Sequence, residues 1–128
     1  MDRVLIAAAP GTTWPLRREE FHASLVERFP EARCYEKHEP VNRVDYLGFY
    51  VDLDGTERHG NYFEGSHLTL EDAEPQEWAP TIEWFLTLLP VAAPVVAVLE
   101  SNPDALAPLP PRATAEEIRA ALAELITE

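Results

Sequence analysis

The sequence predicts an α+β fold, with a mixed, mostly antiparallel sheet of about five strands, a central β-hairpin meander, and helices packed on one face. Two observations support this prediction. Residues 45–63 alternate apolar and polar side chains on either side of an Asp-Gly pair, and the segments that flank them show helical spacing of apolar residues. Such strands and helices bury one face each, so they stack in layers around a core. At 128 residues, the chain is long enough for a single domain, residues 1–128.

The hairpin is the clearest element in the sequence. Apolar residues occupy every second position before the turn, at Leu47, Phe49, Val51 and Leu53. This period of two is typical of a strand with one face in the core. The pair Asp54-Gly55 suits a two-residue type I′ turn, because both central residues of that turn have positive φ.

The turn fixes which residues of the hairpin lie opposite each other. Tyr50 then faces His59, and Tyr46 faces Phe63. Asp52 faces Glu57 in the same register, which is unfavourable for two like charges. A longer loop with a bulge would separate these carboxylates, and the sequence leaves that alternative open.

The segments before the hairpin predict strand, helix and strand in order. The apolar run Arg3–Ala9 predicts a buried strand that ends at Pro10-Gly11. Thr12 or Thr13 is expected to cap a helix, with Pro15 in its first turn and Pro30 after its end. Its apolar stripe is Phe21, Leu25, Val26 and Phe29. A short strand at Ala32–Tyr35 and a loop over Glu36–Arg43 complete this half.

The segments after the hairpin predict two further strands and two helices. We expect a strand at His67–Leu70, a helix whose apolar face runs from Trp78 to Leu89, and a buried strand at Pro94–Leu99. Ser101–Asp104 indicates a short helical turn, and the proline-rich Ala107–Pro111 an extended connector. Thr114 and Glu117 form the sequence of a capping box, ahead of a terminal helix with Ile118, Leu122, Leu125 and Ile126 on one face.

The charge of the chain restricts its partners. The formal net charge is −13 and the isoelectric point is near 4.6. Such a charge disfavours binding to nucleic acid or an anionic membrane, and it favours a basic protein partner. An acidic surface that only maintains solubility explains the charge equally well. No lysine or arginine occurs between Arg58 and Arg112, whereas eight acidic residues do, which modestly favours a partner.

Cysteine content and the absence of a targeting segment indicate a cytoplasmic protein. Cys34 is the single cysteine, so no disulfide forms within the chain. The apolar run Val4–Ala9 is too short for a signal peptide, and prolines interrupt Phe85–Leu99 below the length of a membrane span. Lys37 is the single lysine among many arginines, alanines and prolines, which suggests a bacterial, high-GC genome.

The sequence contains no motif that dictates a chemistry, so we expect no cofactor, no metal and no catalytic residue. The Pro10-Gly11-Thr12-Thr13 junction lacks the glycine and lysine pattern of a phosphate-binding loop. Cys34 and His38 form one short-spaced pair of metal ligands without a second pair to complete the site. His59 and His67, with Glu57 or Glu64, would need to meet across strands, and surface histidines are the simpler interpretation.

One face of the hairpin carries the even-numbered residues of its first strand and the residues opposite them on the second strand. We call it the even-numbered face, and it is the best candidate for a contact surface. Tyrosines bring area and a polar group at low entropic cost, and acidic residues at the hairpin tip complement a basic partner. The candidate partner-binding residues are Tyr46, Tyr50, Asp52, Glu57, His59 and Phe63, together with the acidic stretch Glu71, Asp72, Glu74 and Glu77. The alternative, which the sequence slightly favours, is that a helix covers this face and the aromatic residues belong to the core.

The sequence leaves three functions open. The first is a non-catalytic inhibitor or immunity-type protein that masks a basic partner such as a toxin. The second is a small-molecule-binding domain or enzyme, with a pocket between the sheet and the 78–89 helix that uses Tyr50, His59 or His67. The third is a homodimer or larger homo-oligomer that pairs through a sheet edge.

Overall fold

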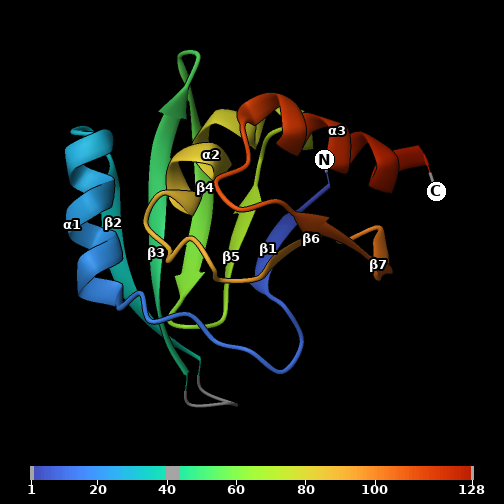
Figure 1. The fold of residues 1–128 in the computed structure, drawn as a ribbon. Coiled ribbons are helices and arrows are strands. Elements are labelled where there is room, and N and C mark those ends of the chain that lie inside the picture. Colours follow the sequence, from blue (N-terminus) through green and yellow to red (C-terminus); the bar gives the residue numbers. More distant parts are fainter. Residues whose placement is uncertain (1, 40–43, 128) are drawn as a thin grey trace.

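A seven-stranded antiparallel sheet forms one layer of the molecule, and the helices form the other (Figure 1). The computed structural model describes residues 2–39 and 44–127. The strand order is β2-β3-β4-β5-β1-β6-β7. In chain order the elements are β1 (Val4–Ala8), α1 (Arg18–Arg28), β2 (Arg33–Glu39), β3 (Val44–Leu53), β4 (Thr56–Phe63), β5 (His67–Glu71), the 3₁₀ helix η1 (Pro75–Trp78), α2 (Ala79–Leu86), β6 (Val95–Leu99), β7 (Asn102–Leu109) and α3 (Ala115–Thr127).

This architecture confirms the predicted α+β class, with helices packed on one face of the sheet. The prediction of about five strands is low by two, and each neighbouring pair within the described residues is antiparallel. Residues 36–39 extend β2 instead of opening a loop, because each pairs with a residue of β3. The expected turn at Ser101–Asp104 and connector at Ala107–Pro111 are mostly strand β7, because Asn102–Leu109 pairs with β6.

The hairpin follows the predicted register. Tyr50 pairs with His59, Gly48 with Asn61, and Asp52 with Glu57. Asp54 and Gly55 have φ of 51° and 83°, the positive values that the type I′ turn requires. The like-charge pair is tolerated without a bulge because each carboxylate has its own donor. Gly55 N–H donates to Asp52 Oδ1 at 2.7 Å, and the Arg33 guanidinium donates to both carboxylate oxygens of Glu57 at 2.7 Å.

The core lies between the sheet and the helices. The odd-numbered residues of β3 and the even-numbered residues of β4 face it, and Leu47, Phe49 and Val51 are at most 3% exposed. Phe21 of α1 stacks on Tyr62 of β4 at 4.6 Å between ring centroids. Trp78, Ile82 and Phe85 are fully buried in the same layer. The predicted apolar faces of the 78–89 segment and of α3 are therefore confirmed, except that Ile126 is 49% exposed.

The start of α1 differs from the prediction. Neither Thr12 nor Thr13 caps it, because the chain runs as a loop to Arg17 before the helix begins at Arg18. Two hydrogen bonds fix this loop in place. The backbone N–H of Trp14 donates to the carbonyl of Gly65 at 2.8 Å, and the Tyr62 hydroxyl donates to the carbonyl of Leu16 at 2.6 Å. Burial of the Trp14 and Leu16 side chains outweighs the local preference of threonine for a capping position.

The terminal helix begins where the capping box predicts. Thr114 N–H donates to Glu117 Oε1 at 2.9 Å, and Glu117 N–H donates to Thr114 Oγ1 at 3.2 Å. These reciprocal bonds satisfy two backbone donors that the first helical turn leaves unpaired. Within the described residues, no helix has both the length and the apolar character needed to cross a membrane.

Candidate binding face of the sheet

The even-numbered face of the hairpin belongs to a sheet face that no helix within the described residues covers. Phe21 of α1 and Phe85 of α2 pack against Tyr62, on the side of the sheet opposite the aromatic residues of this face. Helix α3 contributes Ile118 and Leu122 to the same core. The alternative in which a helix buries these aromatic residues is therefore wrong. We call this surface, formed by β2, β3, β4, β5, β1 and β6 on the side away from the helices, the open face. Tyr46, Tyr50, His59, Phe63 and Glu71 lie on it and are partly exposed.

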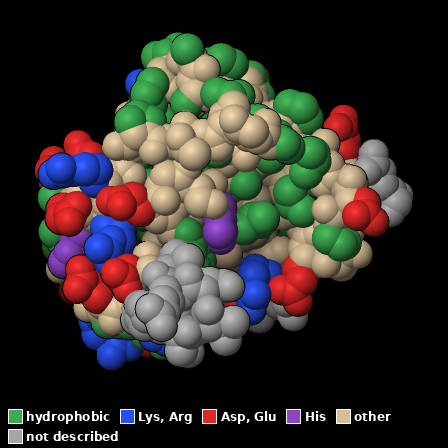
Figure 2. All heavy atoms as spheres, turned by 90° about the horizontal axis from the view of Figure 1, so that it is seen from below, with side chains coloured by type: hydrophobic (Ala, Val, Ile, Leu, Met, Phe, Trp, Pro, Cys, Tyr) green, Lys and Arg blue, Asp and Glu red, His purple; other side chains and the backbone are tan. Residues whose placement is uncertain are grey.

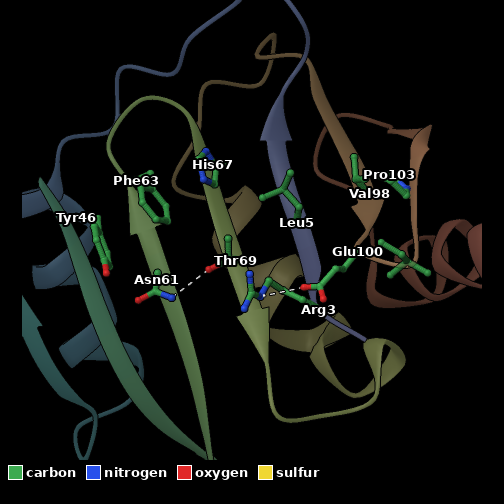
Figure 3. Close-up of a pocket in the computed structure, with 11 residues that line it drawn as sticks. Arg3, Leu5, Tyr46, Asn61, Phe63, His67, Thr69, Val98, Glu100 and Pro103 are labelled. Carbon is green, nitrogen blue, oxygen red and sulfur yellow. Dashed lines mark hydrogen bonds and ion pairs between the residues drawn. The ribbon is translucent and has the colours of Figure 1, made fainter. Parts of the chain in front are cut away.

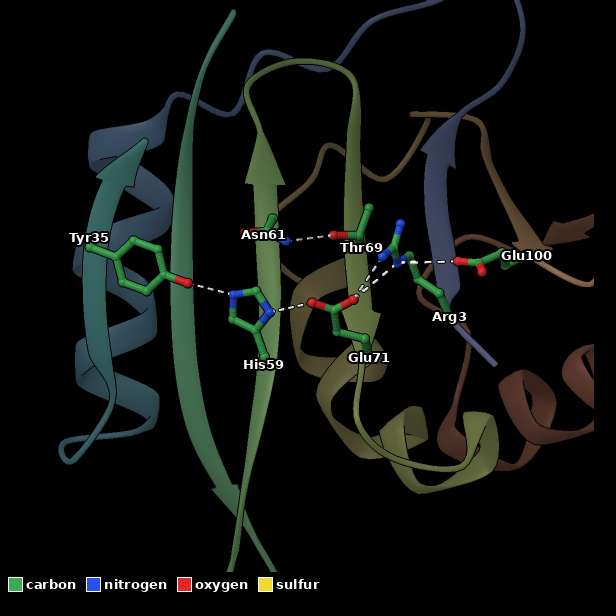
Figure 4. Close-up of polar contacts among 7 residues, drawn as sticks. All are labelled: Arg3, Tyr35, His59, Asn61, Thr69, Glu71 and Glu100. Carbon is green, nitrogen blue, oxygen red and sulfur yellow. Dashed lines mark hydrogen bonds and ion pairs between the residues drawn. The ribbon is translucent and has the colours of Figure 1, made fainter. Parts of the chain in front are cut away.

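A chain of polar contacts crosses the open face from β2 to the end of β6 (Figure 4). The Tyr35 hydroxyl lies 2.6 Å from His59 Nε2, and His59 Nδ1 contacts Glu71 Oε1. Arg3 Nε donates to Glu71 Oε2 at 3.1 Å and lies 3.4 Å from Glu100 Oε2. We call this series Tyr35–His59–Glu71–Arg3–Glu100 the polar chain. It joins side chains from strands that are far apart in the sequence.

The absence of a side chain at Gly48 allows the polar chain to begin on β2. A Cβ at this position would lie 2.3 Å from the Tyr35 ring, far below a normal contact distance. The ring therefore lies flat across β3 and reaches His59 on β4. A single glycine within a strand signals such a close approach, and this was the sequence signal for the missed residue Tyr35.

The protonation states within the polar chain follow from the carboxylate of Glu71. Burial alone would raise the pKa of Glu71, but the His59 hydrogen bond and the Arg3 charge outweigh it and hold the pKa below its usual value. An ionised carboxylate only accepts hydrogen bonds. In the neutral imidazole, His59 Nδ1 therefore carries the proton, and Nε2 accepts from the Tyr35 hydroxyl.

This order of hydroxyl, imidazole and carboxylate resembles the arrangement of a nucleophile with its base. Burial and the neighbouring Tyr50 raise the pKa of the Tyr35 hydroxyl, which disfavours its deprotonation. An activated nucleophile needs the opposite shift or a base that removes its proton readily. The polar chain links β2, β4, β5 and β1 by side-chain contacts across the sheet.

A row of stacked rings lies on the other half of the open face. Tyr46 stacks on Phe63 with 4.5 Å between centroids, and Phe63 stacks on His67 at 4.3 Å. Burial lowers the pKa of His67, so its ring is neutral at pH 7. We call these three residues the aromatic row. They come from β3, β4 and the start of β5, and the antiparallel register brings them side by side.

A hollow of about 510 Å³ lies beside the aromatic row (Figure 3). Leu5, Val98 and Pro103 line its far side, and Asn61 and Thr69 lie on its floor. Its volume is in the range of small-molecule pockets, roughly 300–1,000 Å³. We expected a pocket between the sheet and the 78–89 helix that uses Tyr50, His59 or His67, but these three side chains lie on the open face, on the other side of the sheet from that helix.

Charged side chains gather on one side of the molecule when it is seen from below (Figure 2). Seen from below, acidic and basic side chains gather together on the left, the side on which α1 lies, and hydrophobic and neutral atoms fill the middle (Figure 2). Arg17 and Arg18 contribute there by pairing with Glu20 and Glu36.

The predicted site residues fall into three places. Tyr46, Tyr50, His59, Phe63 and Glu71 share the open face, and Asp52 and Glu57 are exposed near the hairpin tip. Asp72, Glu74 and Glu77 follow β5 where the chain turns toward the helices. Glu74 and Glu77 form a capping box at η1, and Pro75 and Trp78 beside them are buried. The structure therefore separates most of the Glu71–Glu77 stretch from the aromatic surface.

The cysteine and metal interpretations can be examined for the described residues. Burial raises the pKa of the Cys34 thiol, which makes it less reactive. The side chain of His38 lies outside the described residues, so its proposed pairing with Cys34 is not addressed. Among side chains that the structure describes, no group of three His, Cys, Asp or Glu residues is placed to hold a metal ion.

Comparison with known proteins does not assign the chain to a family. No family model, no curated protein and no solved structure matches it.

Proposed function

We propose that this chain is a non-catalytic binding protein that masks a basic protein partner, such as a toxin, through the open face of its sheet. The observation that carries the proposal is the aromatic row and its tyrosine neighbours on a sheet face without a covering helix. Exposed antiparallel sheet faces are usually polar, and clustered aromatic side chains on a surface are typical of binding sites.

The charge of the chain supports a basic partner. The formal net charge of −13 attracts cationic proteins over distances beyond direct contact and speeds their association. Asp52 and Glu57 border the open face at the hairpin tip, which places local negative charge beside the tyrosines. This combination of aromatic area and surrounding acid suits a partner with arginine-rich or lysine-rich surface.

A small-molecule-binding domain is the second candidate, and the hollow beside the aromatic row favours it. The two candidates differ in what fills the hollow. A small molecule would bind with little dependence on salt, whereas a basic protein would lose affinity steeply as salt rises.

Pairing of two copies through a sheet edge is opposed by the composition of both edge strands. β7 carries Pro103 and Pro108, which lack the N–H groups that a new strand needs, and β2 carries Arg33, Glu36 and Lys37. Prolines and charges at edge strands protect natural sheets from association. A monomer by light scattering at high concentration is the expected result.

The single cysteine and its raised pKa fit a reducing compartment, so we place the binding activity in the bacterial cytoplasm. The test is capture of partners by the immobilised protein from a lysate of the organism that encodes it, followed by mass spectrometry. We expect one dominant protein of high isoelectric point, released as salt rises from about 0.05 M to about 0.5 M. Absence of a partner, or a partner that salt does not affect, would count against the proposal.

A further inference from the structure

The hollow beside the aromatic row has an aliphatic wall. Leu5, Val98 and Pro103 form this wall, on strands β1, β6 and β7, and the aromatic row lies across the hollow from them (Figure 3). Within the aromatic row, the two neighbours of Phe63 stack on either side of its ring, so only the edge of that ring is left for an occupant. The hollow therefore suits a group that packs against aliphatic carbon, because Phe63 leaves no ring face for stacking.

The charged side chains at one end of the hollow are already paired. Arg3 Nη2 lies 3.1 Å from Glu71 Oε2, and Arg3 Nε lies 3.4 Å from Glu100 Oε2. A charged occupant of either sign would compete with one member of these ion pairs. Burial lowers the pKa of His67, so its ring adds no charge to the hollow at pH 7. An uncharged occupant leaves the ion pairs intact.

The polar groups on the floor of the hollow also tolerate an apolar occupant. Asn61 Nδ2 donates to Thr69 Oγ1 at 3.2 Å, so these two side chains bind each other. Asn61 Oδ1 is covered by the protein's own atoms and has no hydrogen-bond partner among the described residues. Because this oxygen is out of contact with solvent before anything binds, filling the hollow removes no hydrogen bond from it.

The surroundings of the hollow are acidic, although its charged end is paired. Arg3 carries one positive charge against the two carboxylates that contact it, and the side chain of Glu100 is 62% exposed. The chain as a whole has a formal net charge of −13. Groups that flank an occupant of the hollow therefore meet a negative potential, which favours lysine or arginine at those positions.

We propose that the hollow receives one aliphatic side chain of leucine size from the basic partner, with lysine or arginine beside it on the partner's surface. This inference rests on the proposed function. An apolar centre surrounded by polar and charged contacts is typical of protein interfaces. The aliphatic side chain packs against Leu5, Val98 and Pro103, and the neighbouring cation lies near Glu100, outside the hollow.

The test is an NMR titration of the whole protein with three peptides, acetyl-Lys-Leu-Lys-amide, acetyl-Lys-Asn-Lys-amide and acetyl-Gln-Leu-Gln-amide. Asparagine is close to leucine in shape but polar, and glutamine removes the flanking charges. We expect the first peptide to bind at least about fivefold more tightly than the second, because only leucine gains from burial. At low salt it should bind about threefold more tightly than the third. The largest shift changes should fall on the methyl signals of Leu5 and Val98.

Several results of this titration would overturn the inference. Absence of binding by the first peptide, equal binding of the asparagine peptide, or shift changes centred away from Leu5 and Val98 would exclude an aliphatic occupant. Equal binding of the glutamine peptide at low salt would exclude the basic flanks. Methyl shifts of Leu5 and Val98 that change with protein concentration, without any peptide, would assign the hollow to a second copy of the chain and contradict a partner's side chain there.

Two variants with matched controls locate the binding. Val98→Phe fills the hollow with an apolar ring and should weaken binding of the first peptide at least about fivefold. Val91→Phe makes the same change at a position after α2 that is 58% exposed, and it should alter the affinity by less than about twofold. Glu100→Gln keeps the shape of the hollow and should weaken binding about threefold at low salt. Glu116→Gln removes the same charge from exposed α3 and should change the affinity by less than about twofold.

The same variants separate this inference from the proposed function. If the captured basic protein binds Val98→Phe and Glu100→Gln as tightly as wild type, the hollow does not receive its side chain, although partner binding stands. If the first peptide binds selectively but the lysate yields no basic protein, the masking function fails, and the selectivity of the hollow for an aliphatic group with basic neighbours stands.

Discussion

The two faces of this sheet are built from the same strands, yet their aromatic rings are arranged differently. On the helix side, Phe21 meets Phe49 at 52° and Phe85 at 68°, although it stacks on Tyr62 at 21°. On the open face, the aromatic row stacks at 23° and 18°. The rings on the helix side are buried and stabilise the fold, whereas the rings of the aromatic row are partly exposed and remain accessible for contact.

Two glycines reveal the same contrast on neighbouring strands. A Cβ at Gly60 would lie 2.4 Å from the Phe49 ring on the helix side, and a Cβ at Gly48 would lie 2.3 Å from the Tyr35 ring on the open face. Each glycine allows a ring from the next strand to cross over it. Only the ring over Gly60 is confined by the core, since Phe49 is 1% exposed.

The largest expected difference between the faces is in the cost of removing a ring. Phe49→Ala should lower the free energy of unfolding by about 3–5 kcal/mol, because it leaves a cavity under the helices. Phe63→Ala should cost on the order of 1 kcal/mol, because its ring is partly solvated. Urea denaturation of both variants measures this contrast. Equal losses would mean that the open face belongs to the core.

Adding a methyl group at the two glycines should give the next largest effect. Gly60→Ala should destabilise by roughly 1–3 kcal/mol, because the buried Phe49 ring has no space to move. Gly48→Ala should cost less, because Tyr35 can swing into solvent. In a double-mutant cycle with Tyr35→Ala, the two open-face losses should be clearly less than additive. Full additivity would show that the ring does not depend on Gly48.

Removing single hydroxyl groups compares the buried Tyr62 with the partly exposed Tyr35. Tyr62→Phe leaves the carbonyl of Leu16 without its donor, and it should cost about 1–3 kcal/mol. Burial also raises the pKa of Tyr62 to about 12, in keeping with a hydroxyl that stays protonated. Tyr35→Phe should cost about 0.5–1.5 kcal/mol, because water can solvate His59 instead. Chemical denaturation at pH 7 measures both, and a larger loss for Tyr35→Phe would contradict the comparison.

The smallest expected effect is the pH dependence of the open face. The lowered pKa of His67 means that the unfolded chain takes up a proton more readily, so this contribution is full above the ordinary value of 6.5 and decreases as pH falls below it. The lowered pKa of Glu71 acts in the same direction, and its contribution decreases as pH falls below the ordinary value of 4.5.

Variants at these two positions separate the two pH ranges. His67→Gln should flatten the stability profile as pH falls below about 6.5, and Glu71→Gln should flatten it below about pH 4.5. Thermal or urea unfolding across this range is the measurement. A profile that neither variant alters would show that other groups control the acid sensitivity.

Local signals in the sequence predicted much of the fold. Alternation in 47–53 and the Asp54-Gly55 turn defined the hairpin register, and Thr114 with Glu117 defined the start of α3. The missed strand β7 has two prolines, which are tolerated because it lies at the sheet edge, so its local pattern indicates a connector. The predicted cap at Thr12 and Thr13 failed because Trp14 and Leu16 are buried by tertiary contacts that local preferences do not contain.

The candidate site could be predicted only in part. The alternation in the sequence placed Tyr46, Tyr50, His59 and Phe63 on one face of the hairpin. Whether helices cover that face depends on packing across the whole sheet. Arg3 and Glu100 are separated by about three quarters of the chain, and they meet because β1 pairs with β6. No short-range pattern carries that pairing. The hollow that they help to line is therefore visible only in the structure.

Affinity of the captured basic partner for two matched variants tests the central claim most directly. One variant carries Tyr46→Ser, Tyr50→Ser and Phe63→Ser on the open face. The other carries Val26→Ser, Val91→Ser and Ile126→Ser, which replace apolar side chains that are 40–58% exposed elsewhere. The open-face variant should lose at least about a hundredfold in affinity, and the other should stay within about threefold of wild type. Equal affinity of the two variants would contradict the assignment of the open face as the binding surface.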